Sequence, residues 1–195
     1  MKLVLATSNK GKVREIKALM ENYEVVPYSE LMQEFEIIED ADTFKGNALI
    51  KARAVFKALN DDSVIVIADD SGISVDILDG APGIYSARYG GDDADDKDNL
   101  NKLMQDIKAK GVESSPAFYT AAIAIVTKNV ERTVHGWMYG IALTEKKGEG
   151  GFGYDPMFIP LGYKETLGEL SDTIKTKLSH RSKALDLARK VLKTL

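Results

Sequence analysis

The sequence predicts an α/β protein with a mixed β-sheet and helices on both sides. Apolar runs of strand length alternate along the chain with segments whose apolar residues recur at helical spacing. The dipeptide Lys128-Asn129 separates two such runs as a hairpin turn, which makes those strands antiparallel neighbours. Of the 195 residues, 44% are hydrophobic and 29% charged, as in a folded protein. This length fits one domain, residues 1–195, or two small lobes sharing a core.

The first half of the chain gives three elements. Residues 2–7 are apolar and β-branched, which predicts a buried strand, and residues 12–21 follow as a helix. A second helix is expected from Phe44 to Leu59, with Thr43 as its N-cap. Residues 64–68 are a buried strand, which we expect to end at the polar residues that follow.

The second half continues the alternation. Residues 73–77 alternate as a further strand, and residues 95–110 have the apolar spacing of a helix. Residues 118–126 and 131–139 are the two strands of the predicted hairpin. A last helix is expected from Ser179, its candidate N-cap, to the C-terminus, with an apolar face made of Ala184, Ala188, Val191 and Leu195.

Composition excludes several classes of protein. The absence of Cys excludes disulfides, thiolate zinc sites and a cysteine nucleophile, and it fits the cytosol. The apolar N-terminal run is too short for a signal peptide, and no stretch approaches the ~18 apolar residues of a membrane span. The net charge of −4 argues against binding to nucleic acid backbones, although a local basic pocket suffices for a small anion.

The first candidate for chemistry is the segment between the first strand and the first helix. The start of a helix favours phosphate through its unpaired N–H groups and the positive end of its dipole. Two lysines add positive charge, but the spacing is not that of a Walker loop. The alternative is a polar turn in which Ser8 or Asn9 caps the helix. The segment comprises Thr7, Ser8, Asn9, Lys10, Gly11 and Lys12.

The second candidate is Asp69-Asp70-Ser71-Gly72, placed after a buried strand. Ligands commonly bind at the carboxyl ends of strands in open α/β sheets. Two adjacent carboxylates repel each other unless a cation joins them. Mg²⁺ prefers a few carboxylates together with phosphate oxygens, so the pair suits it. The alternative is an Asp-rich turn.

The third candidate is the glycine-rich run from Gly148 to Pro156. Dense glycine is costly in conformational entropy and is justified where the backbone bends or approaches another group closely. Phe152 and Tyr154 are placed to stack on a nucleobase, and Asp155 to accept a hydrogen bond from the edge of the base. The alternative is a hinge with both aromatic rings turned into the core.

The fourth candidate is Ser179-His180-Arg181, which follows Lys175 and Lys177. Histidine and arginine donate hydrogen bonds to phosphate or to a carbonyl oxygen of a base. The alternative is a capped helix with a basic first turn. The other histidine, His135, lies in a predicted strand and is interpreted as structural, and two distant histidines give no zinc motif.

Taken together, these segments resemble the inosine triphosphate pyrophosphatase family. Any one of them is a weak signal, but the ordered set spans nearly the whole chain and is highly specific. It consists of Thr7-x-Asn9-x-x-Lys12, Asp69-Asp70-Ser71-Gly72, the run from Gly80 to Tyr89, Phe152-Gly153-Tyr154-Asp155-Pro156, and Ser179-His180-Arg181.

The resemblance implies a long mixed sheet in two lobes, a substrate cleft between them, and a homodimer. It implies Mg²⁺-dependent hydrolysis of inosine, deoxyinosine and xanthosine triphosphates to the monophosphate and pyrophosphate. By motif position, Asp70 is the general base, and Glu39 and Asp69 help it hold Mg²⁺. The expected substrate contacts are residues 7–12, Lys51 and Lys175 at the phosphates, Ser71, Phe152 stacked on the purine with Gly153 and Tyr154 beside it, and Asp155, His180 and Arg181 at the 6-oxo edge.

The chain departs from the family pattern at two positions. Gly46 precedes Asn47 where the family often carries Glu, which removes one acidic group from the metal site. Ile174 replaces a commonly acidic neighbour of Lys175. The residue types alone leave the bond that is cut open, because attack at the α or the γ phosphorus needs the same groups. An orthophosphate-releasing phosphatase, a pyrophosphatase for modified pyrimidines and a regulatory nucleotide binder without turnover are the alternatives.

Overall fold

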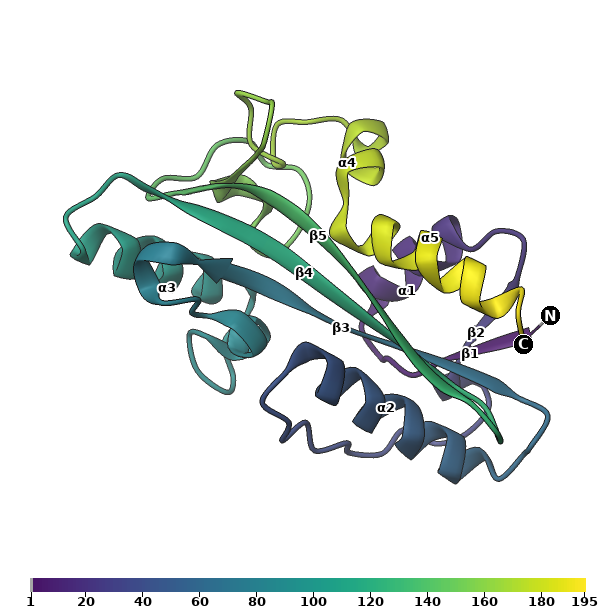
Figure 1. Ribbon diagram of the computed structural model, residues 1–195. Coiled ribbons are helices and arrows are strands. Elements are labelled where there is room, and N and C mark those ends of the chain that lie inside the picture. Colours follow the sequence, from purple (N-terminus) through teal and green to yellow (C-terminus); the bar gives the residue numbers. More distant parts are fainter. Residues whose placement is uncertain (1) are drawn as a thin grey trace. The chain divides into compact units, whose positions relative to one another are not determined.

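The computed structural model describes residues 2–195 and has six strands and five α-helices among them (Figure 1). The strands are β1 (Lys2–Leu5), β2 (Glu24–Pro27), β3 (Ile65–Val75), β4 (Ser114–Val126), β5 (Glu131–Leu143) and β6 (Phe158–Pro160). The helices are α1 (Lys10–Leu19), α2 (Phe44–Leu59), α3 (Asp96–Ala109), α4 (Asp172–Leu178) and α5 (His180–Leu192). No helix within residues 2–195 is long and apolar enough to cross a membrane.

All six strands belong to one mixed sheet in the order β2-β1-β3-β4-β5-β6. β1 pairs in parallel with β2 and with β3, where Leu3 lies beside Ile65 and Leu5 beside Ile67. β5 pairs antiparallel with β6, with Ile141 opposite Ile159. The predicted mixed sheet is therefore confirmed.

The chain divides into two compact units. Unit 1 comprises residues 1–70, 121–136 and 181–195, and unit 2 comprises residues 71–120 and 137–180. The long strands β3, β4 and β5 contribute residues to both units.

Unit 1 has an apolar cluster on each face of its part of the sheet, with α1 and α5 on one face and α2 on the other (Figure 1). Successive side chains of a strand point to opposite faces. Accordingly Ile67 packs with α1 and α5, whereas Val66 and Ala68 pack with α2. The predicted bounds of α2 and its Thr43 cap are confirmed, since Thr43 Oγ1 accepts from the Gly46 N–H at 3.1 Å.

Unit 2 has one apolar cluster. It contains buried residues of α3, β3 and β4 together with apolar residues in and around β6. α3 begins with a capping box in which the side chains of Asp95 and Asp98 accept reciprocally from each other's backbone N–H groups. Leu100, Leu103 and Ile107 form its buried face, as the helical spacing predicts.

The prediction that a strand ends at Asp69 is wrong. β3 continues without interruption through Asp69-Asp70-Ser71-Gly72 to Val75. Asp and Gly disfavour strands when considered locally, but here partners on neighbouring elements stabilise the buried carboxylates. The separate strand predicted over residues 73–77 is also wrong beyond Val75, because Ile77 lies in a 3₁₀ turn, Asp76–Leu78.

The C-terminal segment contains two helices rather than one. Ser179 is the C-cap residue of α4, and α5 begins at the next residue. Ala184 and Ala188 are buried as predicted, but α5 ends at Leu192, so Leu195 is exposed beyond it and the prediction for Leu195 is wrong.

Gly72 allows a close approach between β3 and the 3₁₀ segment Gly83–Arg88. A Cβ at Gly72 would lie 2.5 Å from the Gly83 carbonyl oxygen and 2.4 Å from Ser86 Oγ. We therefore expect Gly72→Ala to lower the free energy of unfolding by about 1–3 kcal/mol, as overpacking does. Urea denaturation measures this loss, and an unchanged midpoint would show that the segment moves away freely.

Candidate functional site

Asp69 and Asp70 point to opposite faces of β3. Neighbouring residues of a strand alternate in direction, so Asp69 faces α1 and α5, and Asp70 faces α2. Their contacts agree with this: Asp69 pairs with Lys12 of α1 and Arg181 of α5, and Asp70 pairs with Lys51 of α2. Each of the two adjacent carboxylates thus has its own side-chain cation, which reduces the repulsion expected between them.

Asp69 is the centre of a buried ion-pair network in unit 1. Its Oδ2 lies 2.7 Å from Lys12 Nζ, and its Oδ1 accepts from Arg181 Nε at 3.2 Å. The other side of the Arg181 guanidinium donates to Glu15 of α1. The side chains of Asp69 and Arg181 are 0% and 3% exposed. The network therefore joins the first helix, the middle strand and the last helix.

Asp70 and Glu39 share one lysine. Lys51 Nζ donates to Glu39 at 2.6 Å and to Asp70 Oδ1 at 3.1 Å. The second carboxylate oxygen of Asp70, Oδ2, is buried and accepts no hydrogen bond from the residues that the structure describes. A buried acceptor without a partner is costly, so this atom is the one in the site most suited to an incoming water or cation.

The two neighbouring carboxyls titrate in opposite directions. Burial raises the pKa of Asp70 above its usual value, and Lys51 only partly opposes this. Burial acts in the same direction on Asp69, but Arg181 and Lys12 outweigh it and hold the pKa of Asp69 well below its usual range. Burial alone would lower the pKa of Lys51, but Asp70 and Glu39 outweigh it and raise that pKa. A carboxyl with a raised pKa is a better proton acceptor, so Asp70 has the properties of a base and Asp69 those of a permanent anion.

The segment Thr7–Lys12 begins α1. The alternative interpretation of this segment, a helix cap, is confirmed for Asn9, whose Oδ1 accepts from the N–H groups of Gly11 and Lys12 at 2.9 and 3.0 Å. Ser8 Oγ donates to Glu34 at 2.9 Å. The backbone N–H groups of Gly11 and Lys12 and the Ser8 hydroxyl, which a phosphate would use, therefore already donate hydrogen bonds within the protein. The lysine side chains of the segment provide most of the attraction for an anion.

The ion pairs of unit 1 contain more carboxylates than cations, and the excess lies at Asp70. In the Asp69 network two cations, Lys12 and Arg181, meet two carboxylates, Glu15 and Asp69, whereas on the other face of β3 Lys51 meets both Glu39 and Asp70. Within residues 2–195 no three acidic or histidine side chains gather closely enough to hold a metal by themselves. Glu39 and Asp70 are nevertheless suitable as a pair of metal ligands. Both accept a hydrogen bond from Lys51, which places them close together, and Asp70 Oδ2 has no hydrogen-bond partner among the described residues. Asp69 is less suitable, since both its oxygens already face cations.

The glycine-rich loop belongs to unit 2, and its two aromatic residues point in different directions. Phe152 is 50% exposed, whereas Tyr154 is buried and donates from its hydroxyl to the Ser86 carbonyl at 2.7 Å. Stacking on a nucleobase therefore stays a prediction for Phe152. Tyr154 instead anchors the loop through its hydrogen bond to Ser86. Asp155 Oδ2 accepts from the Phe152 N–H at 3.3 Å, and Gly153 N–H donates to Asp96 at 3.1 Å.

Other candidates in unit 2 lie near this loop. The predicted close approach of backbone is confirmed, because a Cβ at Gly148 would lie 2.3 Å from the Gly168 carbonyl carbon. Lys175 Nζ is beside the loop as well, 3.6 Å from a Cβ placed on Gly150. Lys175 also pairs with the exposed Asp172 at 2.9 Å, a surface contact of small value that a phosphate can replace. Ser71 is half-buried on β3.

The two histidines have different environments. His180 is 8% exposed and its ring stacks on that of Tyr119, with 4.8 Å between the centroids and 15° between the planes. His135 lies on β5 in unit 1, where burial and then Lys45 lower its pKa. His135 thus stays a structural residue in our interpretation.

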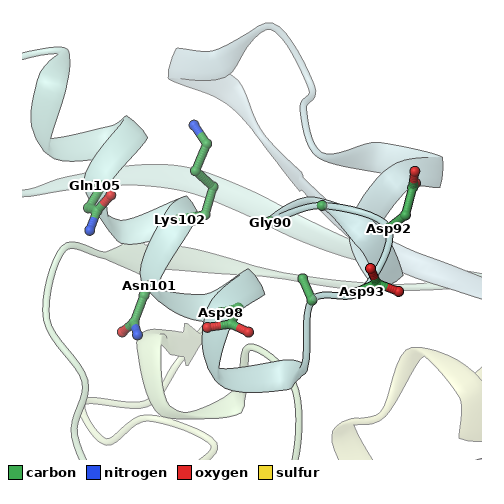
Figure 2. Close-up of a pocket in the computed structure, with 9 residues that line it drawn as sticks. Gly90, Asp92, Asp93, Asp98, Asn101, Lys102 and Gln105 are labelled. Carbon is green, nitrogen blue, oxygen red and sulfur yellow. The ribbon is translucent and has the colours of Figure 1, made fainter.

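A hollow of about 600 Å³ in unit 2 contains none of the predicted site residues (Figure 2). It lies between the loop around Gly90 and the exposed face of α3, and Asp92, Asp93 and Asp98 line it. Its single lysine, Lys102, is paired with Asp106 at 2.5 Å. Its acidic lining makes it unsuitable for a triphosphate.

Two residues of this arrangement escaped sequence analysis. Glu15 lies three residues after Lys12, a spacing that puts both on one helical face and that was a usable signal. Tyr119 is an ordinary aromatic residue of a strand, and its contact with His180 depends on segments 61 residues apart in the chain. No local signal identifies such a pair.

The mixed sheet and the lysine-bridged carboxylates define the class, an α/β protein with a charged site suited to phosphate chemistry. A model of the Ham1 family matches residues 3–191, and the chain belongs to that family. It is 66% identical to the dITP/XTP pyrophosphatase of Sulfurimonas denitrificans, in an alignment that covers 100% of both chains. It is 50% identical to the dITP/XTP pyrophosphatase of Campylobacter jejuni subsp. jejuni, in an alignment that covers 100% of this chain and 98% of the relative.

Solved structures agree. The Staphylococcus aureus Ham1 protein matches with a TM-score of 0.87 at 36% identity. The match covers 100% of this chain and 99% of the Staphylococcus aureus chain. A HAM1 protein from Coxiella burnetii matches with a TM-score of 0.89 at 32% identity over 100% of both chains. The family expected from the sequence motifs is confirmed.

Proposed function

We propose that this protein hydrolyses non-canonical purine nucleoside triphosphates, namely ITP, dITP and XTP, to the monophosphate and pyrophosphate with Mg²⁺. The observation that carries the proposal is the buried Asp70 carboxyl, which has a raised pKa and an unpaired oxygen next to Lys51. The full-length relatives that bear the name dITP/XTP pyrophosphatase support the substrate class. Removing these nucleotides would cleanse the nucleotide pool.

In the proposed reaction, Asp70 accepts a proton from a water molecule. The water oxygen forms a bond to the α phosphorus, and the bond from that phosphorus to the bridging oxygen breaks. Pyrophosphate leaves with the bridging oxygen and its electron pair, and the monophosphate retains the oxygen from water. Lys12, Lys51 and Lys175 stabilise the phosphate charge, and residues 7–12 align the chain of phosphates.

Glu39 and Asp70 would hold the Mg²⁺. Asp69 precedes Asp70 on β3 but faces the other side of the sheet, where it pairs with Lys12 and Arg181. When bound, the ion would supply positive charge that neutralises phosphate oxygens. The excess of carboxylates in unit 1 supports a divalent cation, because a polyanion gains little from a negatively charged network without one. Gly46 provides no further ligand, and a side chain there would meet Ala41, with its Cβ 2.4 Å from that of Ala41.

For base recognition we assign stacking to the exposed Phe152 and the 6-oxo edge to His180 and Asp155. Arg181 is predicted at the same edge, but its guanidinium already binds Asp69 and Glu15. A base oxygen would have to replace one of these carboxylates. We therefore propose that Arg181 contributes chiefly by fixing Asp69 and, through it, Lys12.

Steady-state hydrolysis of ITP, XTP, GTP and ATP with Mg²⁺, with pyrophosphate and orthophosphate measured separately, tests this function. We expect pyrophosphate from ITP and XTP and much slower turnover of ATP and GTP. Release of orthophosphate would identify a phosphatase. Binding without turnover would identify a regulatory nucleotide binder, and preference for a modified pyrimidine would change the substrate class.

We further propose that the protein acts in the cytosol as a homodimer and does not bind nucleic acid. An apolar stripe supports the dimer: Trp137, Tyr139 and Ile141 are 43%, 59% and 44% exposed on one face of β5, beside Leu161 at 78%. A large side chain has ~150–250 Å² of surface. Multiplied by these exposed fractions, the four side chains supply roughly half of the ~800 Å² that each partner buries in a standard interface. No charged residue lies between Trp137 and Leu143, so two copies meet without repulsion.

The dimer is tested by converting the stripe to a charged surface. We expect Trp137→Lys/Tyr139→Lys to sediment as a monomer in analytical ultracentrifugation at concentrations where the parent protein is a dimer. Ile38→Lys, at a side chain that is 71% exposed in unit 1, is the matched control and should remain a dimer. A dimeric double variant would mean that another surface mediates self-association.

A further inference from the structure

We propose that Tyr119 is a positioning residue that fixes the plane of the His180 imidazole and thereby sets the preference for 6-oxo purines. Tyr119 lies on β4 and His180 at the first position of α5. The inference rests on the proposed contact of His180 with the base. Neither the family motifs nor the ion-pair network of unit 1 includes Tyr119.

Tyr119 contacts two other rings. It meets Phe158 edge to face, with 4.8 Å between the centroids and 70° between the planes. It also stacks on His180, with the same separation and 15° between the planes. Phe158 is fully buried and Tyr119 is 7% exposed, so dense packing restricts the tyrosine ring. These contacts link β6 through β4 to the start of α5.

The stack on Tyr119 determines which way the imidazole edge points. The nitrogens of a histidine ring donate and accept in the plane of the ring. A ring stacked nearly parallel to Tyr119 keeps that plane constant. Discrimination between a 6-oxo and a 6-amino purine depends on directional hydrogen bonds to one edge of the base. Loss of the stack would let the imidazole rotate, and the penalty would fall on the 6-oxo substrates that use its hydrogen bond.

Histidine NMR tests the geometry directly, because the chain has only 2 histidines. Stacking on an aromatic ring displaces the carbon-bound proton signals of His180, and His135 serves as an internal reference. We expect Tyr119→Leu and Tyr119→Met to remove this displacement and Tyr119→Phe to retain it. The Met variant fills the space with a flexible side chain, so it keeps the test usable if the Leu variant does not fold. Unchanged His180 signals in both aliphatic variants would overturn the proposal.

The functional test is the ratio of kcat/KM for ITP to that for ATP. The contribution of an aromatic pair corresponds to a loss of about 3- to 10-fold in this ratio. We expect this loss in Tyr119→Leu and Tyr119→Met, but neither in Tyr119→Phe nor in the control Phe118→Leu, whose ring packs on Tyr139 instead. Combining Tyr119→Leu with His180→Gln should lower the ratio no further than His180→Gln alone, because the tyrosine acts through the histidine.

The outcomes separate the two levels of the proposal. If His180→Gln lowers the ratio and the aliphatic Tyr119 variants do not, the positioning role is wrong and the base contact of His180 stands. If His180→Gln leaves the ratio unchanged, the base contact itself is wrong and the role of Tyr119 falls with it. Additive losses in the double variant would also overturn the positioning role.

Discussion

Asp70→Asn is expected to lower kcat for ITP by about 10²–10⁴-fold, the range for removal of a general base. Asn keeps the size of the side chain but carries no charge, and it cannot accept the proton of the attacking water. Because Asp70 is also a proposed Mg²⁺ ligand, binding of ITP, measured by calorimetry, should persist at an Mg²⁺ concentration higher than the parent protein needs. In the parent enzyme, kcat/KM should rise with pH through a pKa above that of an ordinary aspartic acid, because burial raises it.

The same variant should lose much less stability than Asp69→Asn, because Lys51 keeps Glu39 as a partner. The folded-state pKa of Asp70 is raised, so ionisation of Asp70 opposes folding at pH values above its unfolded pKa. A neutral Asn avoids that cost. Asp62→Asn, at an exposed carboxylate paired with Lys128, is the control and should keep full activity. Full activity in Asp70→Asn would show that another group accepts the proton.

Asp69→Asn is expected to lower the stability of the fold much more. The pKa of Asp69 is held far below its usual range, so its ionised form stabilises the fold above the unfolded pKa, and this stability is lost as the pH falls through the folded pKa. Breaking a buried ion pair costs about 3–5 kcal/mol. At pH 7 we expect a fall in Tm on the order of 10 °C, measured by calorimetry.

Asp70→Asn is the matched control for this loss, since it changes the adjacent residue in the same way. A Tm for Asp69→Asn equal to that of Asp70→Asn would contradict the assignment of Asp69 to the network of Arg181 and Lys12. Because Lys12 would also lose its anchor, the KM for ITP should change in Asp69→Asn more than in the Asp62→Asn control.

The elements of the fold were largely predictable, because helices and strands leave periodic patterns. α2 was predicted with its bounds and cap, and α3 to within one residue of each end. The failure at β3 has a physical reason: Asp69 and Gly72 have poor strand propensity, and their stabilising partners lie on other elements. Tertiary contacts of this kind leave no trace in local sequence.

The site was predictable as a set of residues but not as an arrangement. Motif resemblance selected Lys12, Lys51, Asp69, Asp70 and Arg181. In unit 1 the structure joins Lys12 and Arg181 to Asp69, and Lys51 to Asp70. It did not indicate that Asp69 and Asp70 face opposite sides of the sheet, because they were expected in a loop. The pairing of Arg181 with Asp69, 112 residues away, depends on how α5 packs on the strand.

The most direct test of the proposed reaction is hydrolysis of ITP with Mg²⁺ in ¹⁸O-labelled water, followed by mass spectrometry of both products. Attack at the α phosphorus, as proposed, puts one ¹⁸O atom into inosine monophosphate and leaves pyrophosphate unlabelled. Label in pyrophosphate or in orthophosphate would place the attack at the β or γ phosphorus and would contradict the proposed reaction.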